Sequence, residues 1–245
     1  MVREVKGKNT EQPREKSRLV VQGHNDHEKR FILTQSPTIQ RCSQRLLIAL
    51  APTLVKEYGM TLALRDITQA YTQSHTPLNR EFWCSIPTEL KKKFPEGTIL
   101  RVVLPLYGIP ESGAHWFVTY AKHHREKLNM KPSTFDPCLM ITKKSNDDDF
   151  GMAALQTDDT LQLSTLAFME KEERELTFKA KPKTILGDGS MEDFNGCRIR
   201  INGSILTVTQ KGQAEKLTIV DIKAANRDQQ YVEQRARGAY IASIC

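Results

Sequence analysis

The chain has 245 residues, of which 39% are hydrophobic, and it can therefore bury a sizeable core in one large domain or two to three subdomains. Its 36 lysines and arginines outnumber its 29 aspartates and glutamates, which gives a formal net charge of +7 and favours a polyanionic partner. The five cysteines are far apart and never form a C-x-x-C pair, so nothing in the sequence suggests a disulfide framework or a zinc site.

No segment of the sequence predicts a membrane location. The first ten residues, "MVREVKGKNT", carry charge but no apolar signal segment. The longest apolar run, "LLIALAPTLV" at 46–55, is interrupted by Pro52 and is too short to span a bilayer. We therefore expect a soluble, intracellular protein that does not bind membranes.

The first elements in chain order are a lead-in, a strand and a helix. Residues 1–15 are polar and basic and predict a flexible lead-in, and "RLVVQG" at 18–23 predicts a short strand. Apolar residues recur at helical spacing over 41–58, and Gly59 stands at the position of a helix C-cap.

The next region alternates short strands with turns. "MTLALRDI" at 60–67 alternates in hydrophobicity, so it predicts a half-buried strand that ends at Asp66. A second strand is expected at 81–87, a basic loop at 91–97, and a strand followed by a Gly- and Pro-rich turn at 99–113.

A helix is expected from about Gly113 to Met130. Trp116, Tyr120, His124 and Leu128 recur every four residues and form one stripe, which is better explained as core than as a ligand site. "FGMAALQ" and "TLQLST" then predict two strands joined by a tight turn, with two adjacent carboxylates at its tip.

The last third of the chain predicts a helix, a hairpin and a final helical region. "LAFMEKEERELTF" at 166–178 is amphipathic. The alternation on both sides of Asn202-Gly203 is typical of a hairpin with a type I′ turn, and a helical region follows from Gln213.

Asp66, Asp158 and Asp159 are three carboxylates that folding would bring together from a strand end and a hairpin tip. Hard oxygen ligands suit Mg²⁺, and a pair of such ions is used in phosphoryl transfer. On spacing alone a solvated acidic turn explains the pair better, because Asp is a common turn residue.

Two other groups of polar residues are set aside. Asp147, Asp148 and Asp149 follow "KKSN" and predict a solvated loop. The histidine pairs His24/His27 and His123/His124 lack the spacing of a metal motif and are interpreted as surface or structural residues.

Six blocks in a fixed order carry a resemblance to a known family. They are "KSRLV" (16–20), "RDITQAYTQS" (65–74), "LPLYGIPESGAHWF" (104–117), "FDPCLM" (135–140), "LQTDDTL" (155–161) and "FNGCRI" (194–199). In this order the chain, from about Lys16 to Cys245, resembles the reverse transcriptase of copia-type LTR retrotransposons. The resemblance reverses the preference for a solvated turn.

The resemblance implies an α+β fold of the right-hand polymerase type, with fingers, a palm containing an antiparallel sheet, and a thumb. Fingers and palm would span residues 16–190 and a thumb-like region 191–245, with the chain ending before any RNase H domain. The family also implies an intracellular location, in the cytoplasm or in virus-like particles, with nuclear access as a further option.

The resemblance also assigns site residues. It implies that Asp66, Asp158 and Asp159 bind two Mg²⁺ ions, with Mn²⁺ as an alternative, and that Tyr71 closes the sugar pocket as a steric gate. Lys16 and Arg18 match residues that hold the incoming triphosphate.

Some positions depart from the family pattern. Gln156-Thr157 precedes Asp158 where relatives usually have an aromatic and an aliphatic residue. Glu111 stands at a Gln position in a block that contacts the template, and Gly113 stands at a Pro position.

The implied activity is RNA-directed DNA polymerisation, with an RNA template, a DNA primer and dNTPs as partners. Two alternatives remain open. One is a catalytically inactive remnant that only binds nucleic acid. The other is an unrelated Mg²⁺ phosphotransferase, for which the sequence contains no Gly-rich phosphate loop.

Overall fold

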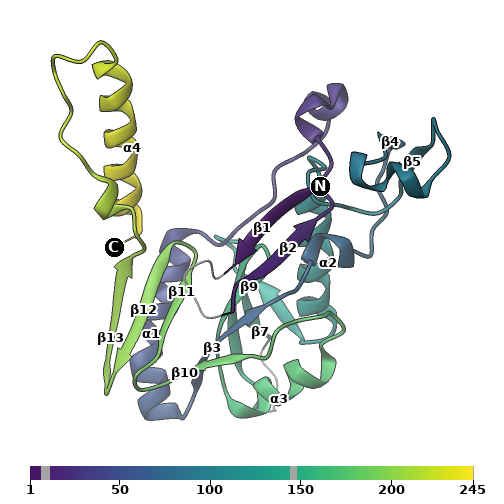
Figure 1. Ribbon diagram of the computed structural model, residues 1–245. Helices are drawn as coiled ribbons and strands as arrows, with labels where there is room; N and C mark the ends of the chain where they lie inside the picture. Colours follow the sequence, from purple (N-terminus) through teal and green to yellow (C-terminus); the bar gives the residue numbers. More distant parts are fainter. Residues whose placement is uncertain (7–11, 144–147, 245) are drawn as a thin grey trace. The chain divides into compact units, whose positions relative to one another are not determined.

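The computed structural model describes residues 1–6, 12–143 and 148–244, which form two compact units. Unit 1 comprises Met1–Pro37, Ile67–Leu128 and Thr177–Lys179, and unit 2 comprises Thr38–Asp66, Asn129–Leu176 and Ala180–Cys245. Helices and several antiparallel sheets are both present, which confirms a mixed class (Figure 1). The division into fingers, palm and thumb stays a prediction, and residues 191–245 group with the large sheet rather than apart from it.

A six-stranded antiparallel sheet forms the core of unit 2. Its strands lie in the order β10 (Thr184–Leu186), β3 (Thr61–Asp66), β9 (Asp159–Ser164), β8 (Gly151–Gln156), β7 (Leu139–Thr142) and β6 (Met130–Pro132). The central strands β8 and β9 are buried on both faces, because nearly all their side chains are apolar or small. The predicted hairpin around the two aspartates is therefore confirmed.

Two helices cover this sheet. Helix α1 (Arg41–Tyr58) packs against β3 and β8 and ends at Gly59, whose φ of 62° is the left-handed conformation that the sequence predicted for a C-cap. Helix α3 (Leu166–Glu175) buries Phe168 completely, and the ring lies so close to Gly151 that a Cβ there would meet it at 2.8 Å.

Strand β3 differs from the half-buried strand that we expected. Leu62 and Ala63 are both buried although they point to opposite faces, and Arg65 is only 2% exposed. Arg65 can be buried because Glu172 of α3 accepts two hydrogen bonds from its guanidinium group. The sequence pattern missed this second covered face because the charge of Arg65 marked it as solvent-facing.

A second sheet of unit 2 contains β11 (Met191–Phe194), β12 (Cys197–Asn202) and β13 (Ile205–Gln210). The β12–β13 hairpin was predicted, but its two-residue loop is Gly203-Ser204 and only Gly203 has a positive φ, so the expected type I′ turn is wrong. The pattern with both φ positive occurs instead at Asn195-Gly196, between β11 and β12. A short 3₁₀ turn (Ala214–Lys216) and helix α4 (Arg227–Ile244) complete the unit.

Unit 1 contains two two-stranded sheets and one long helix. β1 (Val2–Lys6) pairs with β2 (Arg14–Arg18), so the expected lead-in without regular structure is wrong, and the strand expected at 18–23 lies earlier in the chain. β4 (Phe82–Ser85) pairs with β5 (Ile99–Val102). Short 3₁₀ turns cover Gly23–Asn25, His27–Phe31, Ala70–Gln73 and Thr88–Lys93.

Helix α2 (Ser112–Glu126) carries the predicted core stripe of unit 1. Trp116 and Tyr120 are nearly inaccessible, and their rings stack with centroids 5.0 Å apart. His124 is buried and its Nδ1 atom lies 2.9 Å from the carbonyl oxygen of Tyr120, which confirms a structural role for this histidine.

Over the described residues, no helix combines the length and the apolar character needed to cross a bilayer.

Candidate active site

The sheet of unit 2 brings the three predicted carboxylates to one end of two neighbouring strands. Asp66, the last residue of β3, is the direct cross-strand partner of Asp159, the first residue of β9. Asp158 immediately precedes Asp159 in the turn. Because the Cβ atoms of cross-strand partners are roughly 4.5–5.5 Å apart, the fold places like charges side by side. The convergence predicted from the sequence is present.

The turn that presents Asp158 has an unusual backbone. Gln156 and Asp159 are paired, so the loop consists of Thr157 and Asp158, and Thr157 has a φ of 54°. A two-residue hairpin normally places glycine at a first position with positive φ, because a β-branched side chain is strained there. Such a conformation costs about 1–3 kcal/mol and is concentrated at functional sites. The strained turn therefore marks the aspartates as candidates for function.

Burial and neighbouring charge both act on Asp159. Burial raises the pKa of its carboxyl group to about 6, and the negative charges of Asp158 and Asp66 act in the same direction. Lys181 opposes this rise in pKa. A site that disfavours its own negative charge gains most from a bound cation.

Lys181 is a cation that this structure places at the site, and it was not predicted from the sequence. Its ammonium group forms an ion pair with Oδ2 of Asp66, and its backbone N–H donates to the carbonyl oxygen of Asp66 at 2.9 Å. The only signal in the sequence was the lysine-rich run "KAKPK" at 179–183. Position 181 is distant from Asp66 along the chain, so no local pattern links them.

The carboxylates do not form a ready-made metal centre. Within the described ranges, no group of three or more His, Cys, Asp or Glu side chains has an arrangement that could hold a metal ion. Asp66 forms an ion pair with Lys181. The donor atoms are nevertheless hard carboxylate oxygens, which is the chemistry that Mg²⁺ and Mn²⁺ prefer.

Three of the residues assigned to the incoming nucleotide belong to unit 1. Lys16 lies exposed on β2 opposite Glu4. Arg18 lies over the ring of Tyr107 at 5.9 Å, and the rings of Tyr107 and Tyr71 are 5.0 Å apart. Tyr107 therefore connects two predicted residues, Arg18 and Tyr71. Tyr107 belongs to the "LPLYG" block, but no pattern in the sequence predicted this role.

Glu111 occupies a different setting from the one expected. Its carboxylate is buried and accepts hydrogen bonds from Arg80 at 2.7 and 3.0 Å. Arg80 also donates hydrogen bonds to Asp26, and this hydrogen bonding lowers the pKa of the Asp26 carboxyl group. The structure thus gives Glu111 a structural partner, while contact with a template stays a prediction.

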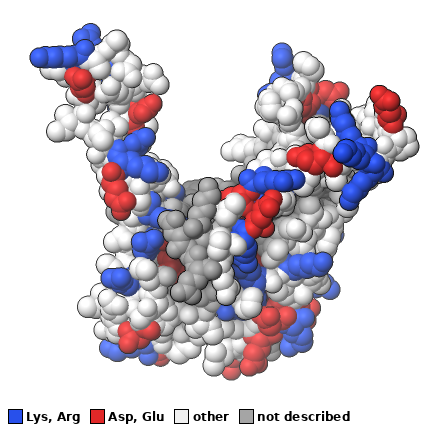
Figure 2. Space-filling view, in the orientation of Figure 1, with Lys and Arg blue, Asp and Glu red and all other residues white. Residues whose placement is uncertain are grey.

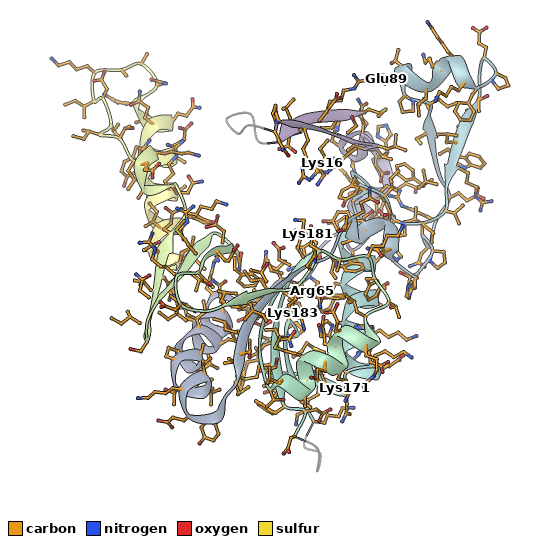
Figure 3. The ribbon with its side chains drawn as sticks, turned by 60° about the horizontal axis from the view of Figure 1, so that its bottom comes forward. Lys16, Arg65, Glu89, Lys171, Lys181 and Lys183 are labelled. Carbon is orange, nitrogen blue, oxygen red and sulfur yellow. The ribbon has the colours of Figure 1, made fainter. Side chains whose placement is uncertain are left out.

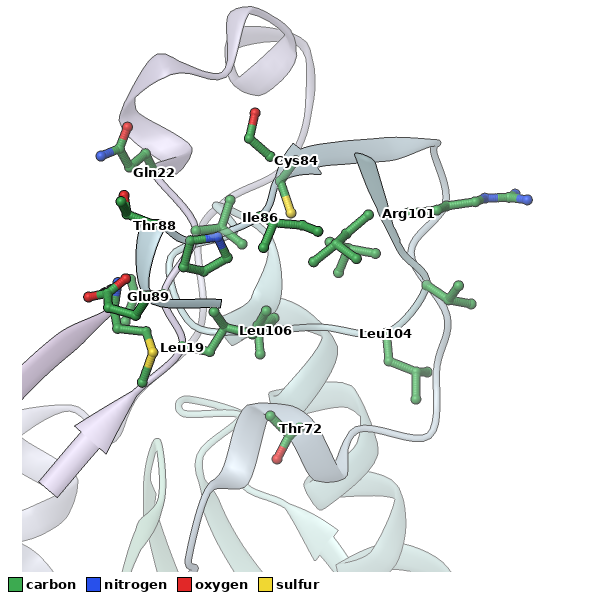
Figure 4. A pocket seen from close by; sticks show the side chains of 18 of the residues that line it. Leu19, Gln22, Thr72, Cys84, Ile86, Thr88, Glu89, Arg101, Leu104 and Leu106 are labelled. Carbon is green, nitrogen blue, oxygen red and sulfur yellow. Dashed lines mark ion pairs between the residues drawn. The ribbon is translucent and has the colours of Figure 1, made fainter. Parts of the chain in front are cut away.

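A pocket of ≈ 980 Å³ lies beside these residues in unit 1 (Figure 4). Leu19 and Thr72, the direct chain neighbours of Arg18 and Tyr71, are among its lining residues, and Ile86 and Leu106 supply apolar surface. Burial raises the pKa of the Cys84 thiol on its wall. The pocket is thus lined by both apolar and polar residues, and two of them directly follow Arg18 and Tyr71 in the chain.

The aspartates at 147–149 were expected to lie in solvent and the histidines His24 and His27 to be surface or structural residues, and the structure agrees for only some of these residues. Asp149 is not solvated as expected, because it is 8% exposed and pairs with Lys171 at 2.6 Å, while Asp147 lies outside the described residues. His24 and His27 are exposed.

On the face shown in Figure 2, lysines and arginines are interspersed with acidic residues instead of forming one uniform basic patch.

A comparison with protein families identifies the family of the chain. A model of the family described as reverse transcriptase (RNA-dependent DNA polymerase) matches residues 1–232. The match includes Asp66, Asp158 and Asp159 and nearly the whole chain, and the chain belongs to this family. Its general function is RNA-directed DNA polymerisation, a nucleotidyl transfer. No curated protein and no solved structure matches the chain.

Proposed function

We propose that the chain is the RNA-directed DNA polymerase domain of a copia-type retrotransposon and that it extends a DNA primer on an RNA template. The observation that carries the proposal is the cross-strand pairing of Asp66 with Asp159, with Asp158 beside them in a strained turn. The family match supports the general activity, and the six motif blocks support the copia type.

The donor atoms of the three aspartates are of the chemical kind that binds divalent cations. Three crowded carboxylates supply oxygen ligands, and the raised pKa of Asp159 indicates a local need for positive charge. When bound, Mg²⁺ or Mn²⁺ ions would activate the primer 3′-hydroxyl and neutralise charge on the triphosphate. Asp66, Asp158 and Asp159 are the residues that would hold them, and Asp66 would exchange its ion pair with Lys181 for a metal ligand.

The remaining assigned residues would act on the nucleotide. Arg18 and Lys16 carry permanent positive charges suited to phosphate oxygens, one as a planar fork and the other as a point charge. Tyr71 would occupy the space of a ribose 2′-hydroxyl and so favour deoxyribonucleotides. Tyr107 contacts both Arg18 and Tyr71, so it would keep their side chains in place.

Positive charge would serve nucleic-acid binding. The net charge of +7 favours contact with the phosphate backbone, which neutralises charge without reading sequence. An RNA–DNA duplex would be recognised through its shape and 2′-hydroxyl groups. An intracellular location, in the cytoplasm or in virus-like particles, is part of this proposal.

The direct test is primer extension by the purified chain on an RNA template with dNTPs and either Mg²⁺ or Mn²⁺. We expect added nucleotides that depend on the divalent cation and on a complementary template. An extension product without a divalent cation would contradict the proposal.

The second candidate is an inactive remnant that only binds nucleic acid. It is favoured by one observation, the ion pair with Lys181 that occupies Asp66, one of the three proposed metal ligands. A chain that binds primer–template but adds no nucleotide with either cation would support this candidate.

A further inference from the structure

Lys181 contacts Asp66 through both its backbone and its side chain, so their interaction is more specific than an ion pair between two surface side chains. The backbone N–H of Lys181 donates to the carbonyl oxygen of Asp66 at 2.9 Å, and its ammonium group pairs with Oδ2 of the same residue. The side chain of Lys181 is 61% exposed, so it can leave without disturbing the core. The chain thus carries its own removable cation at a proposed metal ligand.

A buried ion cluster holds the backbone around Lys181. Arg65, the neighbour of Asp66 on β3, donates from Nη1 to the carbonyl oxygen of Lys181 at 3.1 Å. The same guanidinium donates to both carboxylate oxygens of Glu172 at 3.2 and 2.9 Å. Lys183 places its ammonium 2.5 Å from Glu172 Oε2. Figure 3 labels Arg65, Lys181 and Lys183 in the same part of unit 2.

The buried ion cluster is better explained by the positions that it fixes than by a contribution to the stability of the fold. The side chains of Arg65, Glu172 and Lys183 are only 2%, 6% and 8% exposed. Removing three charges from water costs free energy that their mutual attraction does not reliably return, so buried ion pairs are weak evidence for stability. Their effect here is to fix α3, β3 and residues 181–183 to one another. Lys181 is consequently held where its ammonium reaches Asp66.

We propose that Lys181 is a positioning residue that occupies Asp66 until a divalent cation replaces it, and that Lys183, bound to Glu172, holds Lys181 in register for this exchange. The proposal rests on the proposed function, because it takes Asp66 as a metal ligand. Lys181 would keep the carboxylates from repelling one another in the metal-free protein. It would also weaken metal binding, because each incoming ion must first displace it.

The test measures binding of Mn²⁺ alone to the purified chain, by the spin-resonance signal of the free ion, at about 0.15 M salt to screen remote charges. The parent should bind Mn²⁺, and Asp66→Asn should bind it more weakly. Lys181→Met should bind about threefold tighter than the parent, the scale of one exposed ion pair. Lys171→Met is the matched control, since Lys171 forms an ion pair with Asp149 instead, and its affinity should stay parental.

Lys183→Met separates positioning from general damage. In the parent it should tighten Mn²⁺ binding, because residues 181–183 lose one of their anchors and Lys181 is held less firmly, whereas in Lys181→Met it should change nothing further. Circular dichroism checks that each variant is folded. Parental affinity in Lys181→Met, or an equal effect of Lys183→Met in both backgrounds, would overturn the inference while leaving an aspartate-dependent site intact. If neither the parent nor Lys181→Met binds Mn²⁺, the inference and the proposed metal site both fall.

Discussion

Asp66 and Asp159 face each other across the ladder between β3 and β9, with one carboxylate at the end of one strand and the other at the start of its neighbour. Like charges in this arrangement destabilise a sheet. The fold retains the pair on strands anchored by fully buried residues such as Leu161 and Leu163. A rigid sheet therefore holds the repelling carboxylates at a fixed separation, which is what a cation site requires.

Asp159→Asn should stabilise the metal-free protein at pH 7 by about 0.5–1 kcal/mol, because it removes one member of a like-charged cross-strand pair. The folded-state pKa of Asp159, about 6, lies above its usual value of 3.8, so the folded state binds the proton more tightly. The parent should therefore lose stability as pH rises from about 4 to 6. Urea unfolding at pH 4 and pH 7 checks this, and a gain in the variant that does not shrink at pH 4 would contradict it.

Glu111→Gln should lower the free energy of unfolding by about 2 kcal/mol, because the partly buried Arg80, whose side chain is 14% exposed, loses a bidentate charged partner. Glu28→Gln is the control, since Glu28 binds the same arginine but its side chain is 64% exposed, and its loss should cost less than about 0.5 kcal/mol. Thermal unfolding of both variants measures the difference. Equal losses would show that burial does not set the strength of this cluster.

Thr157→Gly should stabilise the chain by about 1 kcal/mol, because glycine adopts a positive φ without the strain that a β-branched residue meets. The matched change is Gly203→Thr, at the corresponding first position of the β12–β13 loop, where φ is 58° and no atom lies within 4 Å of an added Cβ. It should cost a similar amount. Denaturant unfolding of the two variants checks these opposite changes in the free energy of unfolding. A lower free energy of unfolding in Thr157→Gly would show that Thr157 is not strained in this turn.

Tyr71→Val should raise incorporation of ribonucleotides relative to deoxyribonucleotides by roughly tenfold or more, if the ring excludes a 2′-hydroxyl. Tyr71→Phe keeps the ring and should keep the discrimination. Single-nucleotide incorporation with paired rNTP and dNTP concentrations measures the ratio. A variant that still extends primers with unchanged discrimination would remove Tyr71 from the role of gate.

Much of the backbone could be predicted because local patterns specify it. The helical spacing and Gly59 predicted α1 to the residue, alternation predicted β3, and the two strand-like flanks of the aspartates predicted β8 and β9. Asn195-Gly196 is the same Asn-Gly dipeptide as Asn202-Gly203, which is typical of a hairpin turn. No hairpin was predicted there, so β11 was missed. β1 was missed because charged, exposed residues gave no apolar alternation.

The supporting residues of the site could not be predicted, because long-range contacts create them. Arg65 is buried through Glu172, which lies 107 positions away, and Lys181 meets Asp66 across 115 positions. The predicted template contact of Glu111 came from its motif block. Its actual environment, a pairing with Arg80, is visible only in the structure. A single sequence specifies which residues can titrate or bind metal, whereas packing decides which of them meet.

The most direct test of the polymerase proposal compares primer extension by the parent, Asp158→Asn and Asp149→Asn on the same RNA template with Mg²⁺. Asp149 is the matched acidic control, because it pairs with Lys171 away from the β3–β9 strand ends. We expect Asp158→Asn to keep primer–template affinity within a few-fold and to lose extension by roughly a hundredfold or more. Asp149→Asn should extend at a rate close to that of the parent if it remains folded. Near-parental extension by Asp158→Asn would contradict the three-carboxylate site.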